Sequence, residues 1–520
     1  MIDRLRAGEE FEVLVIGGGA TGLGAAVEAT TRGYRTALIE RDDFAKGTSS
    51  RATKLVHGGV RYLKQGNVAL VRGALRERGR LLRNAPHLTR NLSFVIPTYS
   101  RRERFFYGTG LGVYDWLAGG LSLGASRGIG REETLRLLEG IDANGVTGGV
   151  LYHDGQFDDA RLAINLAQTA AEHGAVVVNR CACIGLEKEA GQVVGVRVRD
   201  GESGTEWVAR AKTVINATGV FVDELRRADD TAARPMVTAS QGIHMVLPRR
   251  FFKGTAALMV PKTADGRVLF IVPWHDRVIV GTTDTPVANV VAEPRALTEE
   301  RAFVMEHARR YLANDPGDGD VLSVFAGLRP LVKATGGSGG RTASLSRDHT
   351  IVTSESGLIT ITGGKWTTYR KMGEDVIDQA ERLAGWAARA SVTAELKIHG
   401  WTEQADAGVY GADAGGVAAL ATEQVEWAER IHPAFDYTRA EVIWQARHEM
   451  ARTVEDVLAR RTRALLLDAR ASIEAAPVVA RLLAGELGRD EAWVAREIAD
   501  YTMLARGYVF TDPTSSGSDK

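Results

Sequence analysis

The sequence predicts an α/β plus α+β protein of three parts: a parallel-sheet domain with an inserted β-meander, an antiparallel-sheet domain and a C-terminal helical domain. Three observations carry this prediction. The apolar run at residues 13–16 is followed by three glycines and then a helical pattern, as in a strand–turn–helix unit whose strand is buried on both faces. Residues 255–285 alternate like antiparallel strands, and after about residue 380 apolar residues recur at helical spacing.

The parallel-sheet domain begins with a strand at residues 11–16. A helix then runs through Arg32 and ends at Gly33, where a residue with positive φ is favoured. Further strands of this layer are predicted at residues 34–39, 175–178 and 213–216, and an inserted hairpin at residues 193–199 and 206–209.

The remaining two parts follow in chain order. Polar breaks at residues 262–266 and 275–276 divide the alternating segment into several antiparallel strands. In the helical part, the apolar residues that recur at helical spacing are Ile443, Ala446, Met450, Val454 and Val457, and residues 492–504 repeat the pattern. Residues 511–520 contain no apolar residue and are expected to be a disordered tail.

Charge and cysteine content exclude several classes of protein. The 65 Lys and Arg residues balance 65 Asp and Glu residues, which argues against a nucleic-acid partner. Cys181 and Cys183 are too few for a disulfide framework or a zinc site, so no metal is expected. The N-terminus leads directly into a strand without a signal-peptide pattern, and no apolar stretch reaches 18 residues. We therefore expect a cytoplasmic protein without a spanning helix.

The glycine cluster has the spacing of a Rossmann-like dinucleotide site. Gly17, Gly19 and Gly22 lie between a strand and a helix, and Glu40 ends the next strand. The first glycine makes the turn, the second lets the backbone approach a pyrophosphate, and the third lets the helix pack on the strand. The helix N-terminus attracts phosphate, while Glu40 accepts from ribose hydroxyls.

Later segments favour FAD over NAD. The hydroxyl-rich loop at residues 47–54 and two distant glycine clusters, at residues 217–219 and 362–365, each follow strand-like runs and would close over an extended cofactor. A nicotinamide site is usually completed within one half of the chain. Besides the residues named above, the predicted FAD contacts are Thr48, Ser49, Ser50, Lys54, His57, Gly58, Ala182, Ala217, Gly219, Gly363, Gly364, Lys365 and Thr367, with His57 expected to orient the flavin loop.

Several strings resemble the FAD-dependent glycerol-3-phosphate dehydrogenases. The glycine fingerprint is shared by many flavoproteins, whereas the strings around residues 57–62 and 363–370 are far more specific. The matching strings are VIGGG (15–19), SS (49–50), KLVHGGVRYL (54–63), GLRPL (327–331), GGKWTTYR (363–370), HEMA (448–451) and RRT (460–462). The resemblance extends from the first strand into the helical domain.

The resemblance implies the reaction and its residues. A phosphate monoester requires two or three cationic donors, and the family places the equivalents of Arg329, Arg347 and Lys365 around the substrate phosphate. The equivalents of Arg61 and His244 would lie near the carbinol, and Tyr62 is a further expected substrate contact. The reaction would be oxidation of glycerol 3-phosphate by hydride transfer to the flavin. His244 is the preferred base because imidazole titrates near working pH, and Arg61 as stabiliser of a developing alkoxide is the alternative.

The expected domains follow from these assignments. They are an FAD-binding domain at residues 1–85, 150–235 and 345–385, a substrate-binding domain at residues 86–149 and 236–344, a helical domain at residues 386–510, which would serve as a cap or a homodimer surface, and the tail at residues 511–520.

The electron acceptor predicted from the resemblance is a membrane quinone, because no extra insert typical of the oxygen-using relatives is present. Residues 101–107 join arginines to aromatic side chains and residues 111–123 are mostly apolar, which is typical of a peripheral anchor on the inner face of the cell membrane. Burial of Phe105 and Phe106 in a core is the competing interpretation. The functional alternatives are an oxidase of the same fold, acting on glycerol 3-phosphate or an amine with oxygen, and a non-catalytic flavin-binding protein.

Overall fold

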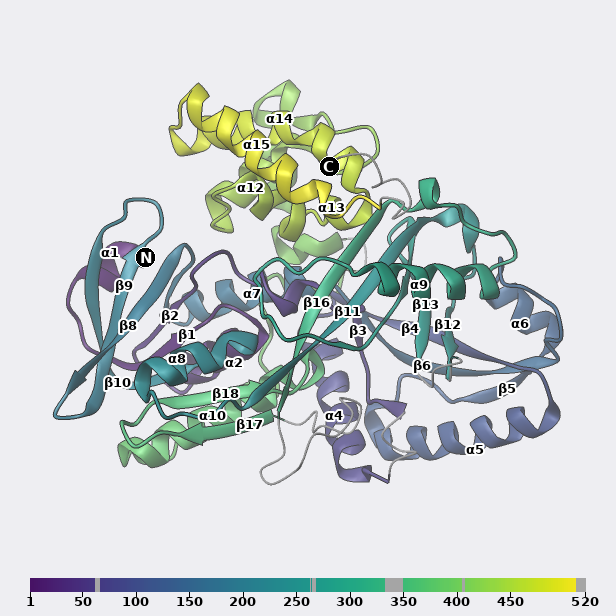
Figure 1. Cartoon of the computed structure of the whole chain (residues 1–520), viewed down its shortest axis with the longest axis horizontal. Helices are drawn as coiled ribbons and strands as arrows, with labels where there is room; N and C mark the ends of the chain where they lie inside the picture. Colours follow the sequence, from purple (N-terminus) through teal and green to yellow (C-terminus); the bar gives the residue numbers. More distant parts are fainter. Residues whose placement is uncertain (61–65, 262, 264–267, 333–348, 405–406, 511–520) are drawn as a thin grey trace.

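A computed structural model describes residues 1–60, 66–261, 263, 268–332, 349–404 and 407–510. Two sheets lie side by side, and a group of helices sits above their junction (Figure 1). The predicted tail and three of the predicted substrate residues, Arg61, Tyr62 and Arg347, lie outside the described residues.

The first sheet is the predicted parallel layer with its meander. Strand β1 (Phe11–Ile16) lies at its centre, parallel to β10 (Glu206–Asn216) on one side and to β2 (Thr36–Ile39) on the other. The neighbours complete the order β17-β18-β10-β1-β2-β7, with bounds β17 (His349–Thr353), β18 (Ile359–Gly363) and β7 (Val176–Val178). The second arm of the predicted hairpin and the strand after it form one continuous β10, which pairs with the first arm, β9 (Gln192–Asp200), and β9 pairs with β8 (Cys181–Glu189).

Three helices cover this sheet and its glycine turn. Helix α2 (Ala20–Thr31) packs between α10 (Tyr369–Ala384) and α7 (Asp159–Glu172). The approach to α10 is close, because a Cβ on Gly373 would lie 2.5 Å from the carbonyl oxygen of Gly24. Helix α2 ends as predicted, with Gly33 at a φ of +81°. Helix α8 (Val222–Asp229) follows β10 after the 3₁₀ turn Gly219–Phe221, and α1 (Ile2–Arg6) packs beside β10 and β7.

The second sheet has the order β15-β11-β14-β13-β12-β4-β6-β3, with β16 on β11 and β5 on β6. Its strands are antiparallel except for the parallel pair of β12 with β4. The bounds are β3 (Leu55–Val56), β4 (Thr89–Thr98), β5 (Arg127–Gly130), β6 (Gly148–Phe157), β11 (Val237–Pro248), β12 (Ala257–Val260), β13 (Leu269–Trp274), β14 (Arg277–Gly281), β15 (Thr285–Pro286) and β16 (Ser323–Val332).

Alternation along these strands separates two cores. One face packs on α9 (Thr298–Tyr311) through residues such as Ile243 and Met245. On the opposite face, α4 (Val68–Asn84) and α5 (Arg101–Ala118) cover β4, β6 and β12, while the helical domain covers Val246, Ile279 and Phe325. Short helix α6 (Arg131–Leu137) follows β5. Because side chains alternate across a strand, His244 shares the face of Val246 and points toward the helical domain's side of the sheet.

Two expected domain boundaries differ from the structure. Strand β6 pairs with β4 along its whole length, from Thr98–Gly148 to Thr89–Phe157, so residues 150–157 belong to the second sheet rather than to the FAD-binding domain. The short β3, inside the expected 1–85 segment, pairs with β6. An alternating strand pattern does not specify which sheet the strand joins, and here the chain returns to the first domain only at α7.

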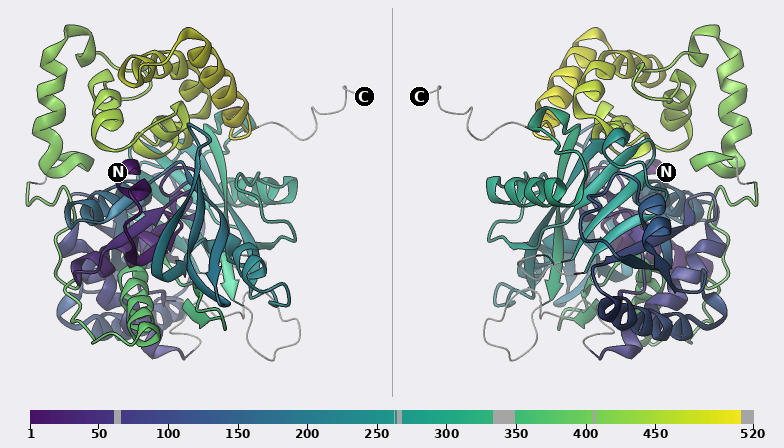
Figure 2. Two further views of the ribbon diagram at one scale, coloured as in Figure 1. Left: turned by 90° about the vertical axis from the view of Figure 1, so that its left-hand side faces the viewer. Right: turned by 90° about the vertical axis from the view of Figure 1, so that its right-hand side faces the viewer.

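The helical domain also begins later than residue 386. Trp386 stacks on Tyr34 at 4.8 Å, and Thr393 donates a hydrogen bond to Glu28, so the segment after α10 runs along the first domain. The helices of this part start at the 3₁₀ turn Gly408–Asp413 and continue as α11 (Ala414–Glu423), α12 (Arg439–His448), α13 (Ala464–Leu467), α14 (Ala469–Leu487) and α15 (Glu491–Arg506) (Figure 2).

The helical spacing from Ile443 to Val457 does not correspond to one continuous helix. Helix α12 ends at His448, Met450 has a φ of +56°, and a π-helical segment, Asp456–Arg461, follows. The apolar periodicity is real, because Val454 and Val457 are buried in the domain core, but the backbone turns between the two halves. Glu449 at this turn forms a buried bidentate ion pair with Arg161 of α7, a contact that a local sequence pattern does not reveal.

Candidate active site

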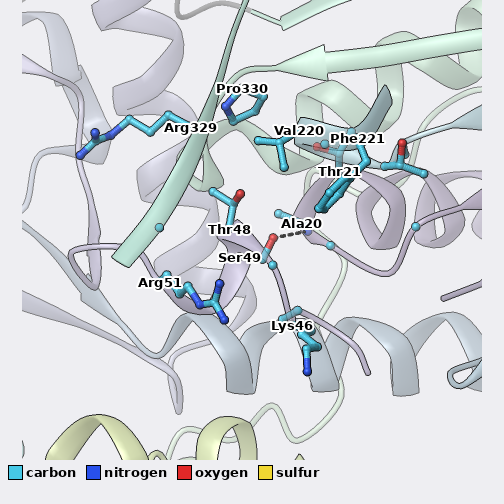
Figure 3. Close-up of a pocket in the computed structure, with 18 of the residues that line it drawn as sticks. Ala20, Thr21, Lys46, Thr48, Ser49, Arg51, Val220, Phe221, Arg329 and Pro330 are labelled. Carbon is cyan, nitrogen blue, oxygen red and sulfur yellow. Dashed lines mark hydrogen bonds between the residues drawn. The ribbon is translucent and has the colours of Figure 1, made fainter. Parts of the chain in front are cut away.

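A cavity of about 600 Å³ opens at the carboxyl ends of β1, β2 and β10 and extends to β11 and β16 of the second sheet. Ligands in open parallel sheets bind at such carboxyl ends. Figure 3 shows residues from both domains around this space, among them Thr48, Ser49 and Arg329. The cavity therefore joins the predicted dinucleotide turn to the predicted substrate strands.

The glycine turn is shaped for close approach of a ligand. Gly17 has a φ of +112°, and a Cβ there would lie 2.7 Å from the carbonyl oxygen of Ala217. Gly22 does not line the cavity but allows the turn, because a Cβ on Gly22 would lie 1.9 Å from the carbonyl oxygen of Gly17. Gly19 is the N-cap of α2 and has no side chain to compete with a phosphate for the helix N-terminus.

Glu40 closes the other side of this turn. Its Oε2 accepts a hydrogen bond from the Gly18 amide at 2.6 Å, and its Oε1 accepts one from the Asp42 amide at 2.8 Å. Burial raises the pKa of Glu40, although both amides favour the carboxylate. Glu40 lines the cavity as predicted for a group beside a ribose.

The loop after β2 holds its hydroxyls against both domains. Ser49 Oγ accepts from the amide of Ala20 at 2.9 Å, at the start of α2, and the Trp366 indole donates to the carbonyl of Ser49 at 2.8 Å. Thr48 donates to the carbonyl of Leu328 on β16 at 2.6 Å. This loop thus connects the dinucleotide turn with the strand that carries Arg329.

Most predicted FAD contacts lie on this one cavity although they span more than 350 residues of sequence. The lining includes Gly17, Gly19, Glu40, Thr48, Ser49, His57, Ala217, Gly219, Gly363, Gly364, Lys365 and Thr367. Five predicted contacts are absent from the lining: Gly22, Ser50, Lys54, Gly58 and Ala182.

The positions of these absent residues have physical reasons. Lys54 is fully buried beneath the loop, where its Nζ contacts Asp159 at 2.7 Å and the carbonyl of Ser50 at 2.8 Å. Gly58 packs beneath Tyr114, whose hydroxyl accepts from the Gly58 amide at 2.7 Å. On β8 the lining is formed by residues 183–185 rather than by Ala182.

His244 lies at the substrate end of the cavity. Its ring is buried, stacks on Phe325 at 4.9 Å, and places Nε2 2.9 Å from Thr53 Oγ1. Burial lowers the pKa of His244 well below its usual range, and the positive charges of Lys54 and Arg329 lower it further. The imidazole is therefore neutral near pH 7 and able to accept a proton.

The predicted substrate cations converge only in part within the described chain. Arg329 and Lys365 line the same cavity as His244. Arg329 donates to Thr282 Oγ1 at 3.1 Å, and its Nη1 lies 3.5 Å from Asp284 Oδ1.

Three further cavity residues escaped the sequence analysis. Thr53 contacts His244; Gly242 faces the end of Arg329, with space for no side chain; and Arg51 packs against Gly327 and pairs with Glu293 at 2.7 Å. Arg51 and Thr53 both lie inside the hydroxyl-rich loop at residues 47–54, so these two had a signal in the sequence. Gly242 had none, because its role depends on a strand paired in space.

Comparison with known proteins agrees with this geometry. Residues 12–370 match the family described as FAD dependent oxidoreductase. A Caenorhabditis elegans protein described as a probable mitochondrial glycerol-3-phosphate dehydrogenase is 40% identical over 528 residues, which cover 95% of this chain and 73% of that protein. The human mitochondrial glycerol-3-phosphate dehydrogenase is 40% identical over 521 residues, covering 93% of this chain and 71% of that protein. This chain belongs to the FAD-dependent glycerol-3-phosphate dehydrogenase family.

Structural comparison extends the family assignment to the whole chain. The glycerol-3-phosphate dehydrogenase from Bacillus halodurans, solved in complex with FAD, superposes with a TM-score of 0.80 at 28% identity and covers 98% of both chains. Residues 359–494 match the family described as the C-terminal domain of alpha-glycerophosphate oxidase. The L-alpha-glycerophosphate oxidase from Mycoplasma pneumoniae shares the fold, with a TM-score of 0.58 at 18% identity, over 75% of this chain and 98% of that chain.

FAD is the cofactor of this dehydrogenase family, and the cavity fits it. The side-chain-free Gly17 and Gly19 leave room for a pyrophosphate at the N-terminus of α2. The lining continues on one side past Phe221 and Leu225 and on the other to Gly363 and His244, as an extended dinucleotide requires. The predicted fold class, enzyme class and cofactor are thereby confirmed.

None of the described helices is both long and apolar enough to cross a membrane.

Proposed function

We propose that this enzyme oxidises sn-glycerol 3-phosphate to dihydroxyacetone phosphate and that its electrons pass on to a membrane quinone. One observation carries the substrate assignment: a buried neutral imidazole and two cationic side chains, Arg329 and Lys365, share a single cavity with the dinucleotide turn. The names of the relatives point to the same substrate.

The cationic side chains bind the phosphate. A phosphate monoester carries a charge of about −1.5 to −2 at neutral pH, and arginine meets it with two parallel N–H donors. Thr282 and Asp284 orient the Arg329 guanidinium, and Lys365 adds a second charge. Arg347 and Tyr62, outside the described residues, are proposed on the family resemblance to complete the substrate contacts.

His244 accepts the hydroxyl proton of the substrate. Bound FAD supplies the hydride acceptor. Thr53 fixes the imidazole at Nε2, and Phe325 fixes the ring plane. Because the charges of Lys54 and Arg329 lower the pKa of His244, the arriving phosphate dianion offsets them and makes the imidazole a stronger base once substrate is bound. Arg61 as an electrostatic stabiliser of the alkoxide remains the alternative assignment.

Anaerobic flavin reduction tests the reaction. Glycerol 3-phosphate should bleach the flavin absorbance of the purified holoenzyme, while glycerol, which lacks the phosphate, should not. His244→Ala should retain FAD and lose most of the reduction rate. No bleaching of the wild-type enzyme would overturn the proposed substrate, and a wild-type rate in His244→Ala would overturn the base assignment. Re-oxidation by air or by a quinone analogue then distinguishes an oxidase from a quinone-linked dehydrogenase.

The proposed quinone route requires contact with the membrane, and α5 offers a surface for it. Phe105, Phe106 and Trp116 are 79%, 60% and 79% exposed, so burial of Phe105 and Phe106 in a core, the competing interpretation, is wrong. At 100° per residue these side chains and Val113 fall within about 100° of the helix circumference. Arg101 and Arg102 begin the same helix, which lies at the outer edge of the molecule (Figure 1). Aromatic side chains beside cations suit a peripheral anchor at residues 101–123 on the cytoplasmic face of the membrane.

Vesicle flotation tests the anchor. The enzyme should float with vesicles that contain anionic lipid, whereas the double variant Phe105→Ser, Phe106→Ser should remain in the lipid-free bottom fraction. Val425→Ser is the matched control, because Val425 is an apolar side chain, 91% exposed, on the helical domain. Flotation of the double variant at the wild-type level, or no flotation of the wild type at low salt, would refute the anchor. The proposed homodimer is tested separately by light scattering.

A further inference from the structure

The helical domain reaches beneath the loop that lines the dinucleotide cavity. We define the cofactor loop as residues 41–54. From the helical domain, Glu455 accepts from Lys46 Nζ at 2.6 Å, and Arg461 Nη2 contacts Asp43 Oδ1 at 3.0 Å. Arg463 Nη2 donates to the carbonyl of Ser50 at 2.7 Å. Each contact joins residues more than 400 positions apart in the sequence. Along the cofactor loop, the residues that the helical domain contacts are Asp43 near the start, Lys46 in the first half and Ser50 in the second half.

The far part of the cofactor loop is wrapped around a single carboxylate. Asp159, at the start of α7, accepts from the amide of Ala52 at 3.0 Å and from Lys54 Nζ at 2.7 Å. Arg463 Nη2 adds a third donor at 2.9 Å, and it also shares the Ser50 carbonyl with Lys54. Arg463, Asp159 and Lys54 are all essentially buried. Removing the guanidinium would take one of two charged donors away from the Ser50 carbonyl and from Asp159 Oδ1, and Lys54 Nζ alone would then supply the charged hydrogen bonds to both buried acceptors.

The backbone of Arg463 adds independent support. Arg463 has a φ of +65°, and Lys54 opposite it also has a φ of +65°. Residues with a side chain adopt this left-handed region at an energetic cost and keep it when surrounding contacts determine it. This backbone conformation directs the Arg463 side chain toward Asp159. Its Nη1 also donates to the carbonyl of Ala459 at 2.9 Å.

The opposite face of the same loop forms the cavity wall. Ser49 Oγ contacts the first amide of α2, where the pyrophosphate is expected, and Thr53 contacts His244. Ser50 lies between them, and its carbonyl is the group that Arg463 holds. A displacement of this carbonyl would move both the dinucleotide end and the catalytic end of the cavity wall.

We infer that the helical domain contributes to the FAD site, with Arg463 as a positioning residue that holds the cofactor loop in its FAD-binding conformation. Arg460 and Arg461 support the same loop through their contacts with Asp43. Docking of the helical domain and FAD affinity are thereby coupled, whichever substrate is oxidised. The coupling is reciprocal, so bound FAD also stabilises the docked helical domain.

The decisive variant is Arg463→Gly. Glycine adopts the positive φ without cost, so the substitution removes the guanidinium while preserving the backbone conformation. FAD is removed from the full-length enzyme, and the dissociation constant is measured by flavin fluorescence during reconstitution. We expect at least a tenfold weaker FAD affinity. Arg463→Lys, which keeps one cation but not the forked geometry, should give an intermediate value.

Glu449→Gln is the matched control. Glu449 forms a buried bidentate pair with Arg161 at the same interface, at 2.6 and 2.8 Å, but its side chain does not contact the cofactor loop. This variant should lower the melting temperature with a change in FAD affinity below twofold. For Arg463→Gly, the rise in melting temperature on adding FAD should shrink, because a positioning role affects the holoenzyme more than the apoenzyme.

The inference is overturned if Arg463→Gly binds FAD like the wild type, or if the apo and holo forms lose equal stability, which is the signature of a purely structural residue. Should Arg463→Gly fail to fold, Arg463→Lys decides: a weakened dissociation constant with a normal apoenzyme melting temperature supports the inference, and a wild-type constant overturns it.

Discussion

Gly242→Ala should weaken substrate binding by displacing Arg329. Gly242 on β11 lies opposite Gly327 on β16, two residues from Arg329. A Cβ at Gly242 would lie 2.2 Å from Nη2 and 2.6 Å from Nη1 of Arg329, and 2.6 Å from Thr282 Oγ1. Ordinary contact distances are about 3.5 Å, so the guanidinium must retreat by about 1 Å. The clash involves flexible side-chain ends, so the fold should persist.

The size of the effect follows from the bonds at stake. Hydrogen bonds to a charged group contribute about 1.5–3 kcal/mol, which corresponds to roughly a tenfold to hundredfold change in affinity. We therefore expect the KM for glycerol 3-phosphate to rise by about that factor, with a smaller change in kcat and an unchanged flavin content. Inhibition by inorganic phosphate should weaken in parallel, because it relies on the same guanidinium.

A double-mutant cycle tests whether the effect passes through Arg329. In an Arg329→Ala background the methyl group meets only Thr282 Oγ1 among these atoms, so Gly242→Ala should add much less further loss. Additive losses in KM would refute the reasoning, as would a loss of FAD from the single variant. Steady-state kinetics with an artificial electron acceptor give the KM of the wild type, of both single variants and of the double variant, and flavin absorbance gives the FAD content of each.

Three further variants probe the base, the interface and the turn. Thr53→Val removes the partner of His244 Nε2, and since a neutral hydrogen bond contributes about 1 kcal/mol, single-turnover flavin reduction should slow about fivefold while Thr53→Ser stays near wild type. Burial opposes ionisation of Glu455, but Arg460 and Lys46 overcome it and lower its pKa from 4.5 to about 2, so its stabilisation, about 3 kcal/mol, is present above pH 4.5 and lost as the pH falls toward 2. Melting curves of the wild type and of Glu455→Gln should therefore converge at low pH, and a constant gap would contradict this origin. Gly22→Ala places a Cβ 1.9 Å from a backbone oxygen and should abolish FAD binding, whereas Gly73→Ala, with no atom within 4 Å of its Cβ, should bind FAD normally.

Local periodicity predicted the first domain well. The apolar run, the glycine spacing and the terminal acid of the next strand are all encoded within 30 residues, and β1, α2 and β2 occur where the pattern places them. The assignment of β6 was wrong, because its alternation fits either sheet and only its pairing with β4 decides between them. The turn at Met450 was missed for a related reason: burial on both sides of the turn preserves the helical spacing while the backbone changes direction.

The site residues that were predicted lie in local sequence patterns, whereas those that were missed depend on contacts between distant parts of the chain. His57, Arg329 and Lys365 lie within strings specific enough to be recognised, and they line the cavity. Lys54 belongs to such a string too, yet it lies beneath the loop on Asp159, so membership in a motif did not reveal whether a residue faces the ligand or supports the residues that do. Gly242 belongs to no motif and acts only through the register of β11 with β16.

The arginines of residues 460–463 show that the fold, and not the local sequence, decides whether a charged side chain is exposed or buried. Residues 460–463 contain three arginines, and such a run is ordinarily solvated, because arginine is seldom fully buried without a partner. Here Arg460, Arg461 and Arg463 are at most 2% exposed, and their partners include Asp43 and Asp159, some 300 to 400 residues earlier in the chain. A net charge of zero is therefore consistent with two different interior clusters. In one, buried acids neutralise the arginines and fix the cofactor loop. In the other, Arg329, whose Nη1 lies 3.5 Å from Asp284 Oδ1, and Lys365 lie on the cavity wall. A substrate anion is expected at the second cluster and not at the first, because only the second presents positive charge to a space that a ligand can enter.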